Sequence, residues 1–304
     1  MNQDSQTPYQ SLKELTPNYE VIALWQQDTL APLHLNQHFI ERGNYKRHDR
    51  ILTHITHPEM VVVPPPSANG VAVLIIPGGG YTKVAFDKEG MDTAEYLSHL
   101  GFTCYVMSYR MPGDGHVWSS NTALADAQRA MRLIRSQAAK QGIEHVAVIG
   151  FSAGGHLAGW LSTRFDLPAY PLQDIVDNYP AQPDLTALIY PVISMDERVT
   201  HLGSRKQLLG SLADKPLHPE FSIETMVTAA TPPCFILHAN DDPSVPSENS
   251  ILMWQALKNH HVDVDLHIVQ QGGHGFGFRQ TKGLTVEAWP TWLHQWLEQR
   301  LGLN

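Results

Sequence analysis

Residues 146–158 read VAVIGFSAGGHLA, and this stretch decides the fold of the chain. Its apolar start predicts a buried strand, Gly150–Gly154 matches the pattern Gly-x-Ser-x-Gly, and Ala153–Thr163 predicts a helix rich in small residues. A serine in a sharp strand-to-helix turn needs small neighbours, and its hydroxyl then projects above the sheet. We therefore predict that Ser152 is the nucleophile of a serine hydrolase. The alternative is an ordinary turn in which Ser152 caps the helix.

Strand-like and helix-like segments alternate from about residue 70 to the end of the chain. Short apolar runs predict strands, and apolar stripes at helical spacing predict helices, two of which end at Gly101 and Gly142. The predicted strands are 71–76, 102–109, 146–149, 185–190, 235–239 and 264–269, and the predicted helices are 89–100, 121–141, 153–163, 247–259 and 286–301. This alternation predicts an α/β fold with a mainly parallel central sheet and helices on both faces.

Two regions depart from the alternation. In the first sixty residues we expect strands at 19–23 and 57–63, separated by a polar stretch, to pair antiparallel at one edge of the sheet. Residues 164–230 contain several prolines and predict a small, loop-rich cap over the edge where open α/β sheets bind ligands. Because no repeat or low-complexity linker divides the chain, we expect one domain, with residues 56–304 as the catalytic part and residues 1–55 as an N-terminal extension packed on it.

A glycine-rich loop, PGGGY at residues 77–81, directly follows the predicted strand 71–76. Acyl transfer builds negative charge on a carbonyl oxygen, and preorganised backbone amides stabilise that charge. Glycines let such amides approach a ligand without obstruction by side chains. We predict that Gly79, Gly80 and Ala153, the residue after the nucleophile, form an oxyanion hole. The alternative for the loop alone is a flexible turn.

An acid and a base follow the serine in the chain order expected for a catalytic triad. Asp241 and Asp242 end the predicted strand 235–239, and we predict that Asp242 is the acid because the D-x-x-V-P spacing starts from it. Asp241 is expected to cap the loop. His274 lies between glycines in GGHGF and is the predicted base, which takes the proton of Ser152 while Asp242 holds the imidazole tautomer.

Five further residues near these motifs are expected to have supporting roles. Tyr81 and Trp118 either form an apolar wall that stacks on a sugar substrate or act as lids over the core. His156 is expected to pack the nucleophile helix and not to bind a ligand. Glu89 is expected to start a helix, where its charge suits the helix dipole. His238, which lies in a predicted strand, is expected to serve the core or the surface.

Composition and charge exclude several classes of protein. The net charge of −9 disfavours nucleic-acid binding, and no run of about 18 apolar residues predicts a membrane span. The first twenty residues lack the basic start and apolar core of a signal peptide, which predicts a cytoplasmic location. Cys104 and Cys234 lie in apolar runs and are expected to be buried, reduced thiols. The seventeen histidines are scattered without the partner ligands of a zinc site, so we expect no structural metal.

The ordered motifs together resemble those of a known family. PGGGY (77–81), SYR (108–110), GFSAGGHLA (150–158) and GGHGFG (272–277) are similar to motifs of the α/β-hydrolase esterases described as acetyl xylan esterase-like or acetylesterase-like, over about residues 55–300. The resemblance implies the α/β-hydrolase fold and a cofactor-free carboxylic-ester hydrolase for short acyl groups, often acetyl groups on sugars. By motif position it implies Ser152, Asp242 and His274 as nucleophile, acid and base. Pro77 stands where related lipases and esterases often carry the histidine of His-Gly-Gly.

The expected substrate is therefore a small-molecule or oligosaccharide ester, with no nucleic-acid or membrane partner, and the resemblance is compatible with a homo-oligomer. A generalist short-chain esterase is the first alternative. A peptidase or amidase is less favoured, because peptidases of the prolyl oligopeptidase type carry a large propeller domain for which this chain has no room. A non-catalytic binding protein of the same fold usually lacks a triad member, whereas all three positions are filled here.

Overall fold

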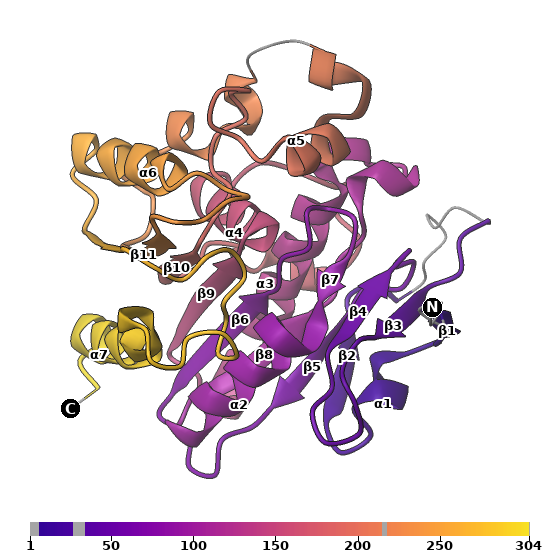
Figure 1. Ribbon diagram of the computed structural model, residues 1–304. Coiled ribbons are helices and arrows are strands. Elements are labelled where there is room, and N and C mark those ends of the chain that lie inside the picture. The colour runs from indigo at the N-terminus through magenta and orange to yellow at the C-terminus, as the bar shows by residue number, and fades with distance from the viewer. Residues whose placement is uncertain (1–5, 27–33, 215–217, 304) are drawn as a thin grey trace.

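The computed structural model describes residues 6–26, 34–214 and 218–303, and an eight-stranded sheet forms its centre (Figure 1). The order across this sheet is β12-β11-β10-β9-β6-β8-β5-β2. The neighbours from β12 to β8 are parallel, whereas β5 and β2 extend the edge as antiparallel strands. The strands are β2 (Glu20–Ala23), β5 (Glu59–Val63), β6 (Val71–Ile76), β8 (Thr103–Met107), β9 (His145–Phe151), β10 (Leu185–Ile189), β11 (Cys234–Ala239) and β12 (Val264–Val269). The predicted α/β fold and its mainly parallel sheet are confirmed.

Helices cover both faces of this sheet. Figure 1 shows α2 and α7 in front of it and α3 and α4 behind it. The α-helices that cover the two faces are α2 (Asp92–His99), α3 (Thr122–Gln141), α4 (Ala153–Thr163), α6 (Glu248–Asn259) and α7 (Trp289–Leu301). The segment predicted as one helix at 89–100 has two parts. A π-helical turn, η1 (Phe86–Met91), comes first, so helical structure begins at Phe86, and α2 follows from Asp92. The cap region contains α5 (Leu202–Leu209) and several 3₁₀ turns above the carboxyl edge of the sheet (Figure 1).

The position of β6 in the sheet brings two motifs together. From β6 the chain crosses to β8 on one side and then returns to β9 on the other. Ile76 at the end of β6 pairs with Gly150 near the end of β9. The glycine-rich loop and the serine turn therefore leave the sheet side by side, at the kind of switch point where open α/β sheets bind ligands.

A second sheet, which the sequence analysis missed, lies in the N-terminal region. Its four antiparallel strands follow the order β1-β3-β4-β7. They are β1 (Gln6–Pro8), β3 (His38–Glu41), β4 (Arg50–Thr53) and β7 (Val84–Ala85). Each strand has at most four residues, which is too short for an alternating pattern to stand out. Because β7 follows the glycine-rich loop, the N-terminal residues pair directly with the segment that carries this loop.

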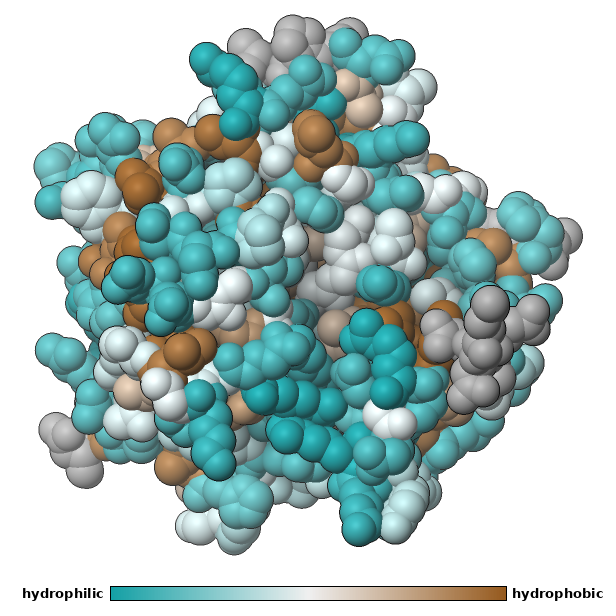
Figure 2. Space-filling view, viewed as in Figure 1, coloured by the Kyte–Doolittle hydropathy of each residue, from teal (hydrophilic) through white to brown (hydrophobic). Residues whose placement is uncertain are grey.

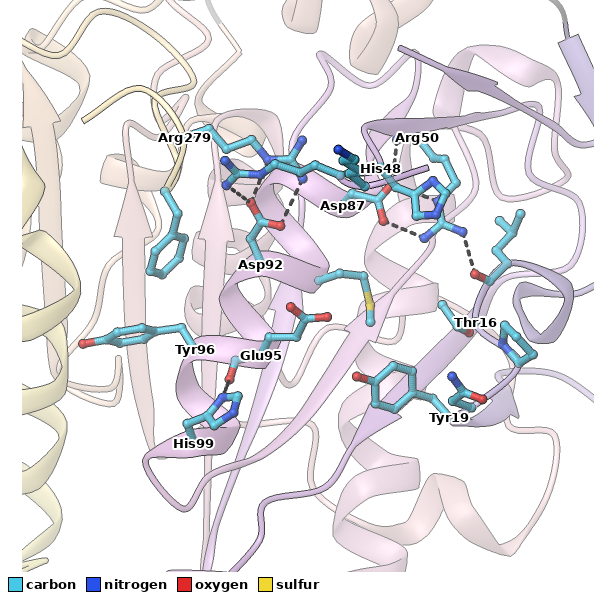
Figure 3. Close-up of a pocket in the computed structure, with 17 residues that line it drawn as sticks. Thr16, Tyr19, His48, Arg50, Asp87, Asp92, Glu95, Tyr96, His99 and Arg279 are labelled. Carbon is cyan, nitrogen blue, oxygen red and sulfur yellow. Dashed lines mark hydrogen bonds and ion pairs between the residues drawn. The ribbon is translucent and has the colours of Figure 1, made fainter. Parts of the chain in front are cut away.

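A buried ion pair fixes the N-terminal residues to η1, and a second pair ties α2 to the C-terminal part of the chain (Figure 3). The backbone amide and guanidinium of Arg50 donate to both carboxylate oxygens of Asp87 at 2.6–2.9 Å. Asp92 accepts from Arg279 at 2.7 Å, just beyond the loop that carries His274. These pairs lie along a cleft of about 740 Å³ whose walls include Tyr19 and Tyr96. The division of the chain at residue 55 stays a prediction.

The surface and the cysteines fit a globular chain. Figure 2 shows a mostly hydrophilic face with hydrophobic residues in small, separate patches. Within residues 6–26, 34–214 and 218–303, no helix combines the length and the apolar character needed to cross a membrane. The cytoplasmic location stays a prediction. Cys104 and Cys234 are buried free thiols, as predicted, and burial raises the pKa of both.

Arg50→Ala tests the attachment of the N-terminal sheet. The substitution leaves the Asp87 carboxylate buried without its cation, so we expect the free energy of unfolding in urea to fall by about 3 kcal/mol. The matched control is Arg198→Ala, whose guanidinium is exposed in its ion pair with Asp196, so that its loss should change the free energy of unfolding far less. Equal effects of the two substitutions would contradict the anchoring role of the Arg50 pair.

Candidate active site

Ser152 occupies a strained turn between β9 and α4. Its φ of 53° and ψ of −120° lie outside the ordinary regions for a residue with a side chain. The turn is possible because its neighbours are small: a Cβ on Gly150 would lie 2.6 Å from the Cβ of Ala158, and one on Gly154 would overlap the carbonyl oxygens of Ile76 and Pro77. The geometry matches the serine elbow that the sequence predicts.

The structure brings Ser152, His274 and Asp242 together. The Oγ atom of Ser152 lies 2.9 Å from Nε2 of His274, and Nδ1 of the same ring lies 2.6 Å from Oδ2 of Asp242. A carboxylate only accepts, so Nδ1 carries the proton and Nε2 is left to accept from the serine hydroxyl. Asp242 is buried, while His274 is partly exposed at 22% of its side chain. This arrangement can remove a proton from Ser152 when a substrate is attacked.

The surroundings of Asp242 keep its carboxylate ionised. Its Oδ1 atom accepts the amides of Ser244 and Val245 at 2.8 and 2.9 Å, and Oδ2 accepts a second histidine, His238, at 3.2 Å. Burial alone would raise the pKa of Asp242, but hydrogen bonds from His238 and His274 keep it well below the ordinary value. The carboxylate is therefore ionised across the pH range in which the histidine can work as a base.

The neighbouring Asp241 has the different role that the sequence predicts. Its Oδ1 atom accepts the amides of Gly272 and Gly273 at 2.9 and 2.8 Å. These bonds fasten the loop before His274 to the end of β11. The two adjacent aspartates thus divide their tasks: Asp241 shapes the loop, and Asp242 contacts the imidazole.

The glycine-rich loop passes directly over the serine. A Cβ on Gly78 would lie only 2.8 Å from the Cβ of Ser152, so no larger residue fits there. Gly79 and Gly80 have φ values of 140° and 67°. No acceptor in the described part of the chain takes the amide of Gly79 or Gly80. The amide of Ala153 belongs to the first turn of α4, where amides lack helical partners. Of the predicted donors, Ala153 follows Ser152 directly, and Gly79 and Gly80 follow Gly78, which contacts the serine.

Tyr81 is not a substrate wall. Its side chain is fully buried, and its hydroxyl lies 2.8 Å from Nδ1 of His156. The backbone of Tyr81 has a φ of 58°, which turns the ring into the core instead of toward a ligand. The other ring nitrogen of His156 bonds the carbonyl oxygen of Phe221 at 2.8 Å. His156 is therefore a packing residue, as expected, and it ties the loop to the cap.

Trp118 does not stand as an open stacking surface beside the serine either. It is half-buried in an aromatic cluster, where its ring centroid lies 5.2 Å from that of Trp25 and 5.7 Å from that of Tyr170. The guanidinium of Arg110 lies over its face, 4.9 Å from the centroid. The structure favours the alternative in which Trp118 covers the core.

Two residues beside the serine have roles that the sequence analysis did not identify. His201, at the start of α5 in the cap, accepts the amide of Ser204 through Nδ1, and its Cε1 atom lies 3.8 Å from where a Cβ on Gly80 would be. Burial, aided by the nearby His274, lowers the pKa of His201, so its ring is neutral with the proton on Nε2. No periodic pattern marks a cap residue of this kind.

The second residue is Glu89, which was expected only to start a helix. It lies inside η1, is buried, and accepts the amide of Gly78 at 2.6 Å. Its charge therefore serves the glycine-rich loop and not the terminus of α2. The sequence contained one signal, since Glu89 follows the PGGGY motif at short range.

Comparison with known proteins agrees with this geometry. The family model named BD-FAE matches residues 61–257. The chain is 35% identical over 227 residues to an acetylxylan esterase of Xylanibacter ruminicola, which covers 72% of this chain and 44% of that protein. It is 36% identical to endo-1,4-beta-xylanase B of Butyrivibrio fibrisolvens over 67% of this chain and 32% of that protein. The chain thus spans less than half the length of these two relatives.

Solved structures show the same fold. The crystal structure of an acetyl ester-xyloside bifunctional hydrolase from Caldicellulosiruptor lactoaceticus has a TM-score of 0.74 and 33% identity, and the match covers 93% of this chain and 97% of that one. Esterase 2 of Thermogutta terrifontis has a TM-score of 0.71 at 21% identity, with 93% of this chain and 95% of that one covered. The second likeness supports the α/β-hydrolase fold.

His156 makes stability depend on pH. Burial lowers the pKa of His156 to about 4, against 6.5 for the unfolded chain, so only the unfolded state takes up this proton between those values. Its contribution to stability is complete above pH 6.5 and is lost as the pH falls toward 4, by about 2 kcal/mol at pH 5. Urea denaturation of wild type and His156→Gln at pH 7.5 and 5 measures this loss. The variant should depend less on pH, whereas the exposed control His260→Gln should follow the wild type. An unchanged pH dependence in His156→Gln would contradict the assignment.

Proposed function

Since the chain belongs to the BD-FAE family, we propose that it is a serine carboxylic-ester hydrolase for short acyl groups and that it deacetylates an acetylated sugar or oligosaccharide. The observation that carries the proposal is the hydrogen-bonded series from Ser152 through His274 to Asp242. The names of the relatives support the substrate class, because an acetylxylan esterase and an acetyl ester-xyloside hydrolase are among them.

In the proposed reaction, Ser152 Oγ attacks the carbonyl carbon of the ester while His274 Nε2 accepts the serine proton. The negative charge on the carbonyl oxygen is stabilised by the amides of Gly79, Gly80 and Ala153. When the carbonyl re-forms, the ester C–O bond breaks, His274 protonates the departing alcohol, and the acyl group remains on Ser152. Water then attacks the acyl-enzyme with His274 again as base, which releases the acid and restores the serine.

The cap supplies a candidate contact for the alcohol part of the substrate. The Nε2–H group of His201 has no hydrogen-bond acceptor within the described residues, and its Cε1 atom lies 3.8 Å from the place a Cβ on Gly80 would take. A neutral donor at this place suits a hydroxyl-rich alcohol such as a sugar. We further propose that residues 56–304 form the catalytic domain and that residues 1–55 pack on it as an extension.

Ser152→Ala tests the nucleophile. Alanine lacks the attacking oxygen, so kcat for p-nitrophenyl acetate should fall by about 10⁴-fold or more, while the circular dichroism spectrum and melting temperature stay near those of the wild type. Ser136→Ala on α3 is the matched control and should retain full activity. Turnover by Ser152→Ala near the wild-type rate would refute the proposed nucleophile.

A comparison of substrates tests the acyl and alcohol parts separately. We expect kcat/KM to be highest for acetate to butyrate esters, and a preference for acyl chains of about twelve carbons or more would contradict the short-acyl proposal. Acetylated xylo-oligosaccharides should be hydrolysed with a higher kcat/KM than simple aryl acetates. The reverse order would favour a generalist esterase, and loss of the preference in His201→Ala would support the contact from the cap.

A further inference from the structure

We propose that Glu89 is a positioning residue that ties the glycine-rich loop to the loop that carries His274, so that both loops reach their working positions together. This inference rests on the proposed function, because it assigns the two loops to one reaction. The evidence is a continuous series of hydrogen bonds through a single buried carboxylate.

One oxygen of Glu89 holds the glycine-rich loop. The amide of Gly78 donates to Oε2 at 2.6 Å, a short, charge-assisted bond. Gly78 passes close to Ser152, and the proposed oxyanion donors Gly79 and Gly80 follow it directly. A shift of the Gly78 amide would therefore move both donors relative to the serine, and displacements of about 1 Å are costly in catalysis.

The other oxygen of Glu89 reaches the loop of His274 through Tyr190. The Tyr190 hydroxyl donates to Oε1 at 3.1 Å. The ring of Tyr190 packs edge-on against His274, with centroids 5.1 Å apart, and against Phe276 at 4.6 Å. Tyr190 thus contacts the catalytic loop at two residues, and Glu89 fixes the position of its hydroxyl.

The choice of a carboxylate is informative because it is costly. Glu89 is only 5% exposed, and burial raises its pKa, opposed chiefly by the hydrogen bond from Gly78 and the charge of His274. Lys88 is close enough to interact with the charge, but its amine bonds Gln280. A buried charge without a bonded cation reduces stability. A carboxylate has two acceptor oxygens, one for Gly78 and one for Tyr190, whereas an amide would place a donating NH₂ group against one of these two donors.

The fold of η1 does not depend on this carboxylate. On the outer side of the same segment, Asp87 is bound by Arg50 and Asp92 by Arg279 (Figure 3). These pairs hold η1 and α2 in place independently of Glu89. The inward carboxylate therefore remains available to act on the two loops.

Steady-state kinetics with p-nitrophenyl acetate test the effect on the reaction. We expect Glu89→Ala to lower kcat by about 100-fold or more, in the range seen when an oxyanion donor is lost. Glu89→Gln keeps one acceptor and should lower kcat by about 10-fold, with KM within about twofold and a melting temperature equal to or above that of the wild type. The exposed Glu95→Gln on α2 is the matched control and should change neither value. Wild-type kcat in Glu89→Gln and Glu89→Ala would overturn the proposal.

Hydrogen–deuterium exchange measured by mass spectrometry tests the connection without any substrate. Glu89→Ala should speed exchange in both segments, 77–85 and 272–278, because both ends of the series are released. Tyr190→Phe removes only the second contact and should speed exchange in 272–278 while 77–85 stays protected. Unchanged exchange in both segments of Glu89→Ala would overturn the proposal, as would an equal effect of Tyr190→Phe on both.

The two experiments separate this inference from the proposed function. If the wild type fails to hydrolyse esters, the proposed function is wrong, but the exchange measurements still decide whether Glu89 couples the loops. If Ser152→Ala abolishes turnover while Glu89→Ala exchanges and reacts like the wild type, the esterase assignment stands and the role of Glu89 is refuted.

Discussion

The close contact between the serine turn and the end of β6 is the constraint on which the candidate site depends. Gly154 in α4 packs so tightly against the carbonyls of Ile76 and Pro77 that no side chain fits between them. The pairing of Ile76 with Gly150 fixes the height of the two strands relative to each other. The strained backbone of Ser152 and the start of the glycine-rich loop at Pro77 are therefore held against each other by one packing contact.

The acid and the base lie on the loops that follow β11 and β12, the two strands beyond β10 at one edge of the sheet. Their loops are longer and need separate fixation, which comes from buried polar contacts. Asp241 binds the amides of Gly272 and Gly273, His238 supports Asp242, and Tyr190 supports His274. The serine turn is thus positioned by strand register, whereas the loops that carry Asp242 and His274 are positioned by hydrogen bonds and ring contacts. This difference explains why polar groups are concentrated around the loops of β11 and β12.

The sequence was sufficient for those parts of the structure that depend on local patterns. The strand β6 and the helix α4 have the predicted limits, and the ordered motifs gave the family resemblance because each needs a specific residue type at a specific turn. Side-chain direction in loops was not predictable. The positive φ of Tyr81 sends its ring into the core, and Trp118 joins residues far away in the sequence, such as Trp25. The N-terminal sheet was missed because its strands are short and β7 has only two residues.

The costs of this architecture are concentrated where the chemistry is proposed. Ser152 adopts a strained backbone, Glu89 is a buried carboxylate without a bonded cation, and His156 stays neutral in the core at the expense of stability in acid. Several other buried charges are paired, such as Arg110 with Asp126 at 2.7 Å, although within the described residues the buried carboxylate of Glu59 also bonds only the hydroxyl of Ser11 and the amide of Leu12. Proteins commonly retain such costs only where function requires them, because substitutions that relieve them are otherwise available. That three such costs meet around one serine turn is thus an argument, independent of sequence motifs, for the proposal that Ser152 lies at the functional centre of the molecule.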